Sequence, residues 1–179
     1  MLIRAAFLVV LALPALRAES SLIECIADAW YAPALKLEGS ATTLRLNQSG
    51  GAVLLAFRVA AVEGWKVEKA VIVLHLAAAS EPVDLAVSLT GGAWQEYSHD
   101  PPPLRETQQT VEKPKQDGWV SIAVPRELAQ ALVDGKATGL ALSSPGASQT
   151  FHSRETIQYS PFFAVVGQRP GSTTKQPAH

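Results

Sequence analysis

The sequence predicts an all-β protein, a sandwich or barrel with one short helix. Runs that favour extended backbone recur along the chain, turn residues separate them at close spacing, and a single segment carries a helical pattern. We expect one domain over residues 19–166, a length that buries about two thirds of the unfolded surface. A hydrophobic core of that size needs no disulfide or metal to support it.

The N-terminal segment predicts export. Arg4 precedes an apolar run at residues 5–16, and Ala18 is followed by the polar Glu19. The run is shorter than the roughly 20 apolar residues that span a bilayer, and no later segment reaches that length. We therefore expect residues 1–18 to be a signal peptide, no transmembrane segment, and a secreted or extracytoplasmic protein. An uncleaved anchor is the alternative, because Leu16 stands where signal peptidases prefer a small residue.

The predicted strands follow from alternation and from β-branched and aromatic residues. In chain order they cover residues 41–46, 52–59, 67–76, 82–89, 118–124, 138–143 and 161–166. Turn residues 47–51 separate the first two runs, which predicts a hairpin. Residues 67–76 are apolar on both faces, which predicts a strand in the middle of a sheet.

Three other segments complete the predicted organisation. A helix is expected between Pro125 and Gly135, because Leu128 and Leu132 recur at helical spacing and proline suits the first turn. Residues 98–117 are polar and contain three consecutive prolines, so we expect a long loop. Residues 167–179 lack apolar periodicity and predict a disordered tail.

Composition limits the function. The formal net charge is −1, which argues against a general nucleic-acid or membrane-surface binder. The only cysteine, Cys25, excludes an internal disulfide, so it is buried, unpaired or linked to another chain. Burial as a small apolar side chain is the outcome we expect.

Catalytic motifs are absent from the sequence. It contains no nucleophile elbow, no zinc-binding His-Glu-x-x-His helix and no glycine-rich phosphate loop, and its histidines are scattered. His152, Ser153 and Glu155 cannot form a proton relay along one strand, because neighbours point to opposite faces. Glu96 and Asp100 are the acids that glycoside hydrolysis would need, but we interpret them as solvated loop residues. We predict no enzyme activity and no cofactor, and we assign no residue as a metal ligand; whether a metal ion is bound stays open.

Several motifs together resemble a known family. They are Ala27-Asp28-Ala29, the runs 54–57 and 67–74, Trp94-Gln95-Glu96, Gly118-Trp119, and Phe151-His152-Ser153-Arg154-Glu155 followed by Pro161 and Val165. In this order they resemble the DNRLRE domain, also called carbohydrate-binding module family 96. The resemblance implies a jelly-roll-like β-sandwich of secreted enzymes and surface proteins, with polysaccharide binding in some members.

The candidate ligand-binding residues are aromatic and basic. Trp30 and Tyr31 could form a stacking platform for a sugar ring, or could simply cover a sheet edge. Lys36, Arg45 and Arg58 could hold the carboxylates or sulfates of an acidic glycan, or could be scattered solvated charges.

The remaining motif residues are predicted to be structural. Trp94 and Trp119 are interpreted as packing residues, with sugar stacking as the alternative. We interpret Ser153, Arg154 and Glu155 as a latch in which Arg154 or Glu155 has a partner elsewhere, and Glu96 as a further motif residue.

Two functions from different classes remain. The first is a non-catalytic carbohydrate-binding module, with an acidic polysaccharide as its ligand. The second is a structural or adhesion domain that binds other extracellular proteins. An aromatic or basic surface would favour the first, and a flat apolar patch would favour the second.

Overall fold

The structure is a computed structural model and describes residues 18–32, 37–46, 51–77, 84–98, 100–110, 118–144 and 148–170. Its strands are β1 (Glu19–Tyr31), β2 (Thr43–Leu46), β3 (Ala52–Phe57), β4 (Lys66–His75), β5 (Leu85–Thr90), β6 (Leu104–Thr110), β7 (Trp119–Ala123), β8 (Gly139–Ser143), β9 (Gln149–His152) and β10 (Phe162–Gln168). Its helical elements are α1 (Arg126–Val133) and the 3₁₀ turns η1 (Val59–Val62) and η2 (Ile157–Tyr159).

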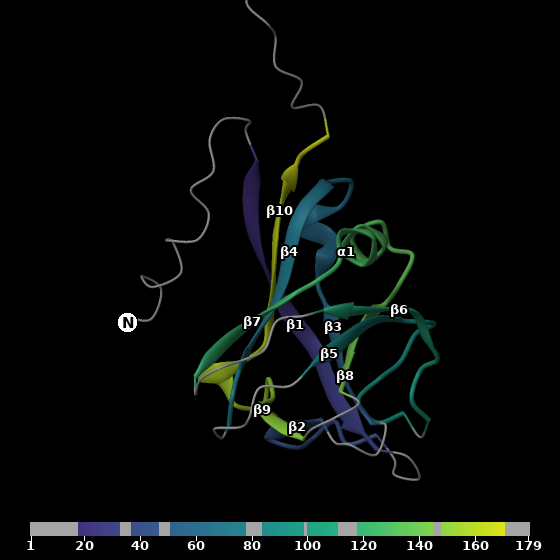
Figure 1. Cartoon of the computed structure of the whole chain (residues 1–179), viewed down its shortest axis with the longest axis vertical. Coiled ribbons are helices and arrows are strands. Elements are labelled where there is room, and N and C mark those ends of the chain that lie inside the picture. Colours follow the sequence, from purple (N-terminus) through teal and green to yellow (C-terminus); the bar gives the residue numbers. More distant parts are fainter. Residues whose placement is uncertain are drawn as a thin grey trace, which may run out of the picture.

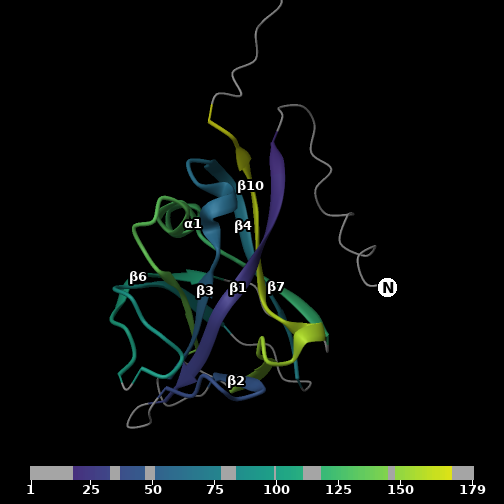
Figure 2. The ribbon, with the colours of Figure 1, turned by 180° about the vertical axis from the view of Figure 1, so that it is seen from behind.

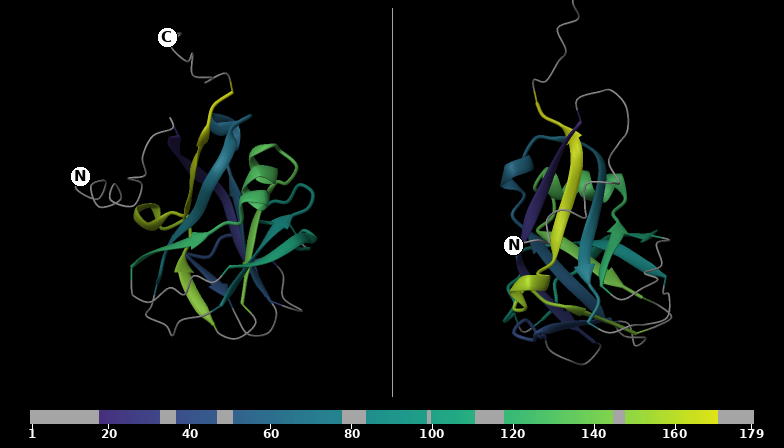
Figure 3. Two further views of the ribbon diagram at one scale, coloured as in Figure 1. Left: turned by 45° about the horizontal axis from the view of Figure 1, so that its top comes forward. Right: turned by 90° about the vertical axis from the view of Figure 1, so that its left-hand side faces the viewer.

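Eight strands form one curled antiparallel sheet in the order β6-β5-β8-β3-β1-β10-β4-β7. Strand β1 joins its two halves, because residues 19–24 pair with β10 and residues 25–31 pair with β3. Figures 1 and 2 show β1 running through the middle of the molecule, and the right-hand view of Figure 3 shows it beside β10. The predicted all-β sandwich with one α-helix is confirmed for the described residues.

A bulge in β1 reverses which residues face the core. The register with β3 shifts between Cys25 and Ala27, so Ile26 is an extra residue. Before the bulge Ile23 and Cys25 point inward, and after it Asp28 lies opposite the core residue Leu55. One extra residue moves every later side chain to the other face. The bulge therefore turns Asp28 toward the core.

The two ends of the main core are closed by different elements. Helix α1 contributes Leu128 and Leu132 at one end, and the β2–β9 pair contributes Leu44, Leu46 and Phe151 at the other. Figure 1 shows α1 near the top of the molecule and β2 with β9 near its base.

Several predicted elements are confirmed and others need correction. Strand β4 lies between β10 and β7, as its two apolar faces predict. The predicted hairpin is wrong: β2 pairs with β9, a distant segment, and β3 pairs with β1 and β8. Strand β6 lies within the predicted loop 98–117, because backbone pairing with β5 supports a strand that the apolar pattern does not mark. Strand β10 continues two residues into the predicted tail and ends at Gln168.

Other predictions concern segments at the margins. Strand β1 begins at Glu19, whereas residues 1–17 and 171–179 lie outside the described residues. Within the described part of the chain, no helix is long and apolar enough to cross a membrane. Cys25 is free and buried, as predicted.

Candidate functional site

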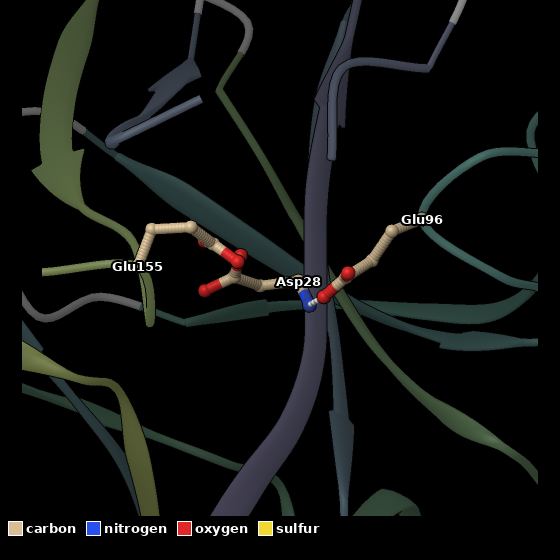
Figure 4. Close-up of side chains that lie close together, drawn as sticks. All are labelled: Asp28, Glu96 and Glu155. Carbon is tan, nitrogen blue, oxygen red and sulfur yellow. Dashed lines mark hydrogen bonds between the residues drawn. The ribbon is translucent and has the colours of Figure 1, made fainter. Parts of the chain in front are cut away.

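The first candidate site is a buried cluster of Asp28, Glu96, Arg154 and Glu155, here called the acid–arginine cluster. Asp28 is fully buried and Glu96 is 6% exposed, whereas Glu155 is exposed. Figure 4 shows the carboxylates of Asp28 and Glu155 pointing toward one another, with Glu96 on the opposite side of β1. The cluster therefore spans from the core to the surface.

Glu96 completes the edge of β1. Residues 25–31 have β3 on one side only, and on the other side Trp30 exchanges backbone hydrogen bonds with Glu38. Next to this bridge, the Asp28 N–H donates to Glu96 Oε1 at 3.0 Å. Glu96 approaches closely because position 39 is glycine: a Cβ there would lie 2.5 Å from the Glu96 carbonyl oxygen. The acidic side chain thus replaces a missing neighbouring strand.

Arg154 binds both buried acids. Its Nε donates to Glu96 Oε1 at 2.6 Å and its terminal nitrogen donates to Glu96 Oε2 at 3.0 Å. Its backbone N–H donates to Asp28 Oδ2 at 2.7 Å. Two parallel charge-assisted bonds make this a strong and directional contact. Arg154 therefore fastens the turn after β9 to β1 and to the Glu96 loop.

The surroundings shift the pKa values of the two buried carboxyl groups, Asp28 and Glu96, in opposite directions. Burial raises the pKa of Asp28 to about 7, and the Glu155 and Glu96 carboxylates add to the rise against the Arg154 N–H. Burial alone would also raise the pKa of Glu96, but hydrogen bonds from Arg154 and from the Asp28 N–H lower it below its ordinary value. Glu96 is consequently the charged partner, and Asp28 is the group poised to hold a proton.

The three carboxylates of this cluster lie close enough to act together on one proton or one cation. The carboxylate oxygens of Asp28, Glu96 and Glu155 lie within 4.8 Å of one another, a spacing suited to a shared proton or a cation. Asp28 has no exposed surface, so a polysaccharide cannot reach its carboxylate.

The second candidate site is an aromatic cluster on the outer face of the sheet. Its members are His75 on β4, Trp119 on β7, His152 on β9, Tyr159 on η2 and Phe162 on β10. His75 points away from the core because its neighbours Leu74 and Leu76 point into it. All five side chains are half-buried. The cluster therefore offers ring surface to solvent.

Tyr159 is at the centre of this cluster. Its ring stacks on His75 with centroids 3.9 Å apart and lies 4.7 Å from the His152 ring. Trp119 meets His75 edge-on at 5.2 Å. Burial and the neighbouring His75 lower the pKa of His152, which favours the neutral form of its ring.

The β2–β9 pair places the Arg45 side chain on the same face as His152 of the aromatic cluster. Thr43 lies opposite His152 and Arg45 lies opposite Thr150, so these four side chains share the outward face, while Leu44 points into the core. The Arg45 guanidinium lies 5.6 Å from the centre of the Trp30 ring. An arginine–tryptophan contact and the aromatic cluster thus lie at two ends of one surface, which we call the β2–β9 face.

The predicted ligand residues are only partly brought together. Trp30 and Arg45 are in contact, but Tyr31 lies on the opposite face of β1 and packs against a separate group of buried residues. A joint platform of Trp30 and Tyr31 is therefore wrong. Arg58 pairs with Glu24 at 3.3 Å, about 20 Å along β1 from Trp30. Lys36 lies outside the described residues.

The predicted structural residues have definite places. Trp94 packs against buried residues on the outer face of the β3 half of the sheet, whereas Trp119 belongs to the aromatic cluster. Ser153 is fully buried and its N–H donates to the Thr42 carbonyl. Arg154, for which the sequence predicts a partner, pairs with Glu96.

Sequence reasoning missed other members of these sites. The interpretation of Glu96 as a solvated acid is wrong, because the β1 edge and Arg154 surround it. The grouping of His75, Tyr159 and Phe162 was not foreseen. Alternation along residues 67–76 places His75 on the outer face, but only the register with β7 and β10 places it beside Trp119 and Phe162.

Comparison with known proteins adds no relative. No protein-family model matches the chain, and no curated protein matches it significantly.

Proposed function

We propose that this chain is a secreted, non-catalytic module that binds an acidic polysaccharide on the β2–β9 face. The proposal includes export directed by residues 1–18 and membership of the DNRLRE-like carbohydrate-binding modules, on the motifs set out above. The observation that carries it is the presence of Arg45, stacked near Trp30, on the same face as His152 and the aromatic cluster.

The chemistry of this face suits a charged sugar chain. Half-exposed aromatic rings stack on the apolar faces of sugars while their polar edges stay hydrated. Arginine presents a planar set of donors that matches a carboxylate or a sulfate. Arg45 is exposed, and its contact with Trp30 holds the guanidinium in place. A ligand that crosses the face would meet rings at one end and a cation at the other.

Affinity electrophoresis or calorimetry tests this proposal. The mature protein should bind a polyuronate such as alginate weakly at low salt, since ordering the chain offsets much of the contact energy. Binding should weaken as salt screens the arginine. Neutral polysaccharides should bind less well, because they offer no anion to Arg45.

Two variants and a matched control locate the site. Arg45→Gln and Tyr159→Ala should each reduce retardation by alginate, and both positions leave the core unchanged. Arg58→Gln removes another exposed arginine, one that pairs with Glu24 away from this face, and should bind like the wild type. Equal binding by Arg45→Gln and wild type, or no binding to any polysaccharide at low salt, contradicts the proposal.

A distinct observation favours an adhesion role as the second candidate. Leu22, Ala164, Val71 and Ala123 form one row across the outer face of β1, β10, β4 and β7. Leu22 is 71% exposed, which is unusual for leucine in a strand. Self-association measured by sedimentation, lost in Leu22→Lys, would favour this role over glycan binding.

A further inference from the structure

The acid–arginine cluster contains an unpartnered oxygen. Asp28 is fully buried, and its Oδ2 accepts the Arg154 N–H at 2.7 Å. Its other oxygen, Oδ1, is equally buried but has no hydrogen-bond donor. Buried carboxylate oxygens nearly always have a hydrogen-bond donor or a bound ion, so the lack of a partner at Asp28 Oδ1 points to a ligand.

The charges of the cluster point to a cation. Three carboxylates lie near one guanidinium, and the two short hydrogen bonds that the Arg154 guanidinium donates both go to Glu96. The Arg154 Nε also forms an ion pair with Glu155 at 3.7 Å, a distance longer than a hydrogen bond. With every group ionised, the cluster therefore carries three negative charges and one positive charge, an excess of two negative charges.

The irregular donor set suits Ca²⁺ better than Mg²⁺, because Ca²⁺ tolerates flexible oxygen coordination. The three carboxylate oxygens lie within 4.8 Å of one another. Two ligands on opposite sides of Ca²⁺ are up to about 5 Å apart, whereas around Mg²⁺ they are about 4 Å apart and octahedral geometry is strict. All three donors are the oxygens that hard cations prefer.

We propose that Asp28 and Glu155, supported by Glu96, form a binding site for a calcium ion. Asp28 provides the buried end, and the exposed Glu155 provides the end through which the ion enters with its remaining waters. The bound ion joins β1 to the turn after β9, next to the contact that Arg154 already makes. The site shares no residue with the β2–β9 face and does not depend on the proposed glycan binding.

Calcium binding by the protein alone tests the proposal. Protein stripped with EDTA and returned to chelator-free buffer at neutral pH is titrated with CaCl2 in a calorimeter, and its melting temperature is followed in parallel. We expect one saturable site with a dissociation constant of about 10⁻⁴–10⁻³ M, the range of extracellular calcium modules. MgCl2 should bind more weakly, and calcium should raise the melting temperature.

Variants distinguish this site from loose association with surface acids. Glu155→Gln keeps the size of the side chain and removes its charge, so it should weaken calcium binding at least tenfold. Glu127→Gln changes an exposed acid in the first turn of α1 and should bind calcium like the wild type. The proposal is overturned by an absence of saturable binding up to about 10 mM calcium, ten times the weak end of that range. It is equally overturned if Glu155→Gln binds as tightly as the wild type.

Discussion

Arg154 shows how one side chain can hold three segments of a β protein together. Its guanidinium binds the Glu96 loop, its backbone N–H binds Asp28 on β1, and it belongs to the turn that follows β9. Glu96 in turn satisfies the Asp28 N–H at the open edge of β1. A buried carboxylate keeps its charge only while such donors surround it.

Replacing Arg154 by alanine should destabilise the fold strongly. Glu96 would remain buried without its cation, at a cost on the order of 3 kcal/mol. The melting temperature should fall by several degrees, since each kcal/mol lowers it by about 3 °C in a domain of this size. Urea unfolding of the two proteins measures the difference directly.

Arg58→Ala is the control for this change. Arg58 also pairs with a glutamate, Glu24, but both side chains are about two thirds exposed, at 68% and 67%. Exposed pairs contribute less than about 1 kcal/mol, so this variant should unfold close to the wild type. Similar losses in the two variants would mean that burial of Glu96 does not matter.

Asp28 should make stability depend on pH. Its pKa is raised in the folded protein from 3.8 to about 7, so the folded state holds a proton that the unfolded state releases. The resulting stabilisation is fully present below pH 3.8 and is lost as pH rises through about 7. A shift of this size corresponds to at most about 4 kcal/mol.

Asp28→Asn isolates this effect. Asparagine resembles the protonated carboxyl at every pH, so in EDTA the variant should melt above the wild type at pH 8 and close to it at pH 5. The lowered pKa of His152 has the opposite effect, because it makes the folded protein less stable as pH falls. This effect is the same in the wild type and in the variant, so it does not change the difference between them. A constant difference between the two melting temperatures across this range would show that the Asp28 carboxyl does not titrate near pH 7 in the folded protein.

At the scale of elements, helix α1 is fastened to the sheet by one amide. Gln130 Oε1 accepts the Val67 N–H at 2.8 Å, and Gln130 Nε2 donates to the Trp65 carbonyl at 2.9 Å. The side chain therefore pairs with the backbone at the start of β4 as a neighbouring strand would. Val67 is fully buried, so its N–H has no access to water.

Gln130→Ala should destabilise the protein by about 1–3 kcal/mol, because it leaves a buried N–H and a carbonyl unpaired. The matched control is Gln168→Ala, which removes an exposed amide contact with Glu68 and should cost less than about 0.5 kcal/mol. Chemical denaturation of both variants gives the comparison. Equal losses would mean that the Gln130 bonds add nothing beyond a surface contact.

At the scale of the whole molecule, β1 connects the two halves of the sheet. Its first half pairs with β10 and its second half with β3, and Cys25 lies at the bulge between them. Cys25 is 3% exposed, and burial together with the nearby Asp28 raises the pKa of its thiol. Separating β1 from either half breaks the main core, so we expect local opening here to be rare.

Thiol labelling measures that expectation. In the native protein Cys25 should react with a thiol reagent only through global unfolding, so the free energy obtained from the labelling rate should equal that from urea unfolding. The urea-unfolded protein serves as the reference for full reactivity. Rapid labelling of the folded protein would show that β1 opens without the rest of the sheet.

The sequence by itself determined the elements whose signals are local. Turn residues and apolar patterns are properties of short windows, so β4, β5, β7, β8 and α1 were predicted near their observed places. Cys25 was predicted to be buried from its residue type, and the all-β class followed from the spacing of the runs. Strand β6 was missed because its support comes from pairing with β5 rather than from its own residues.

Only the tertiary structure decided which distant residues meet. The bulge at Ile26 turns Asp28 inward, and a single inserted residue leaves no mark in the pattern of hydrophobicity. Pairing of β2 with β9, rather than with β3, brings Arg45 onto the same face as His152. Glu96 and Arg154 meet across the open edge of β1, where long-range register sets their distance. Local patterns record which face a residue occupies, whereas a binding site depends on how separate strands are aligned.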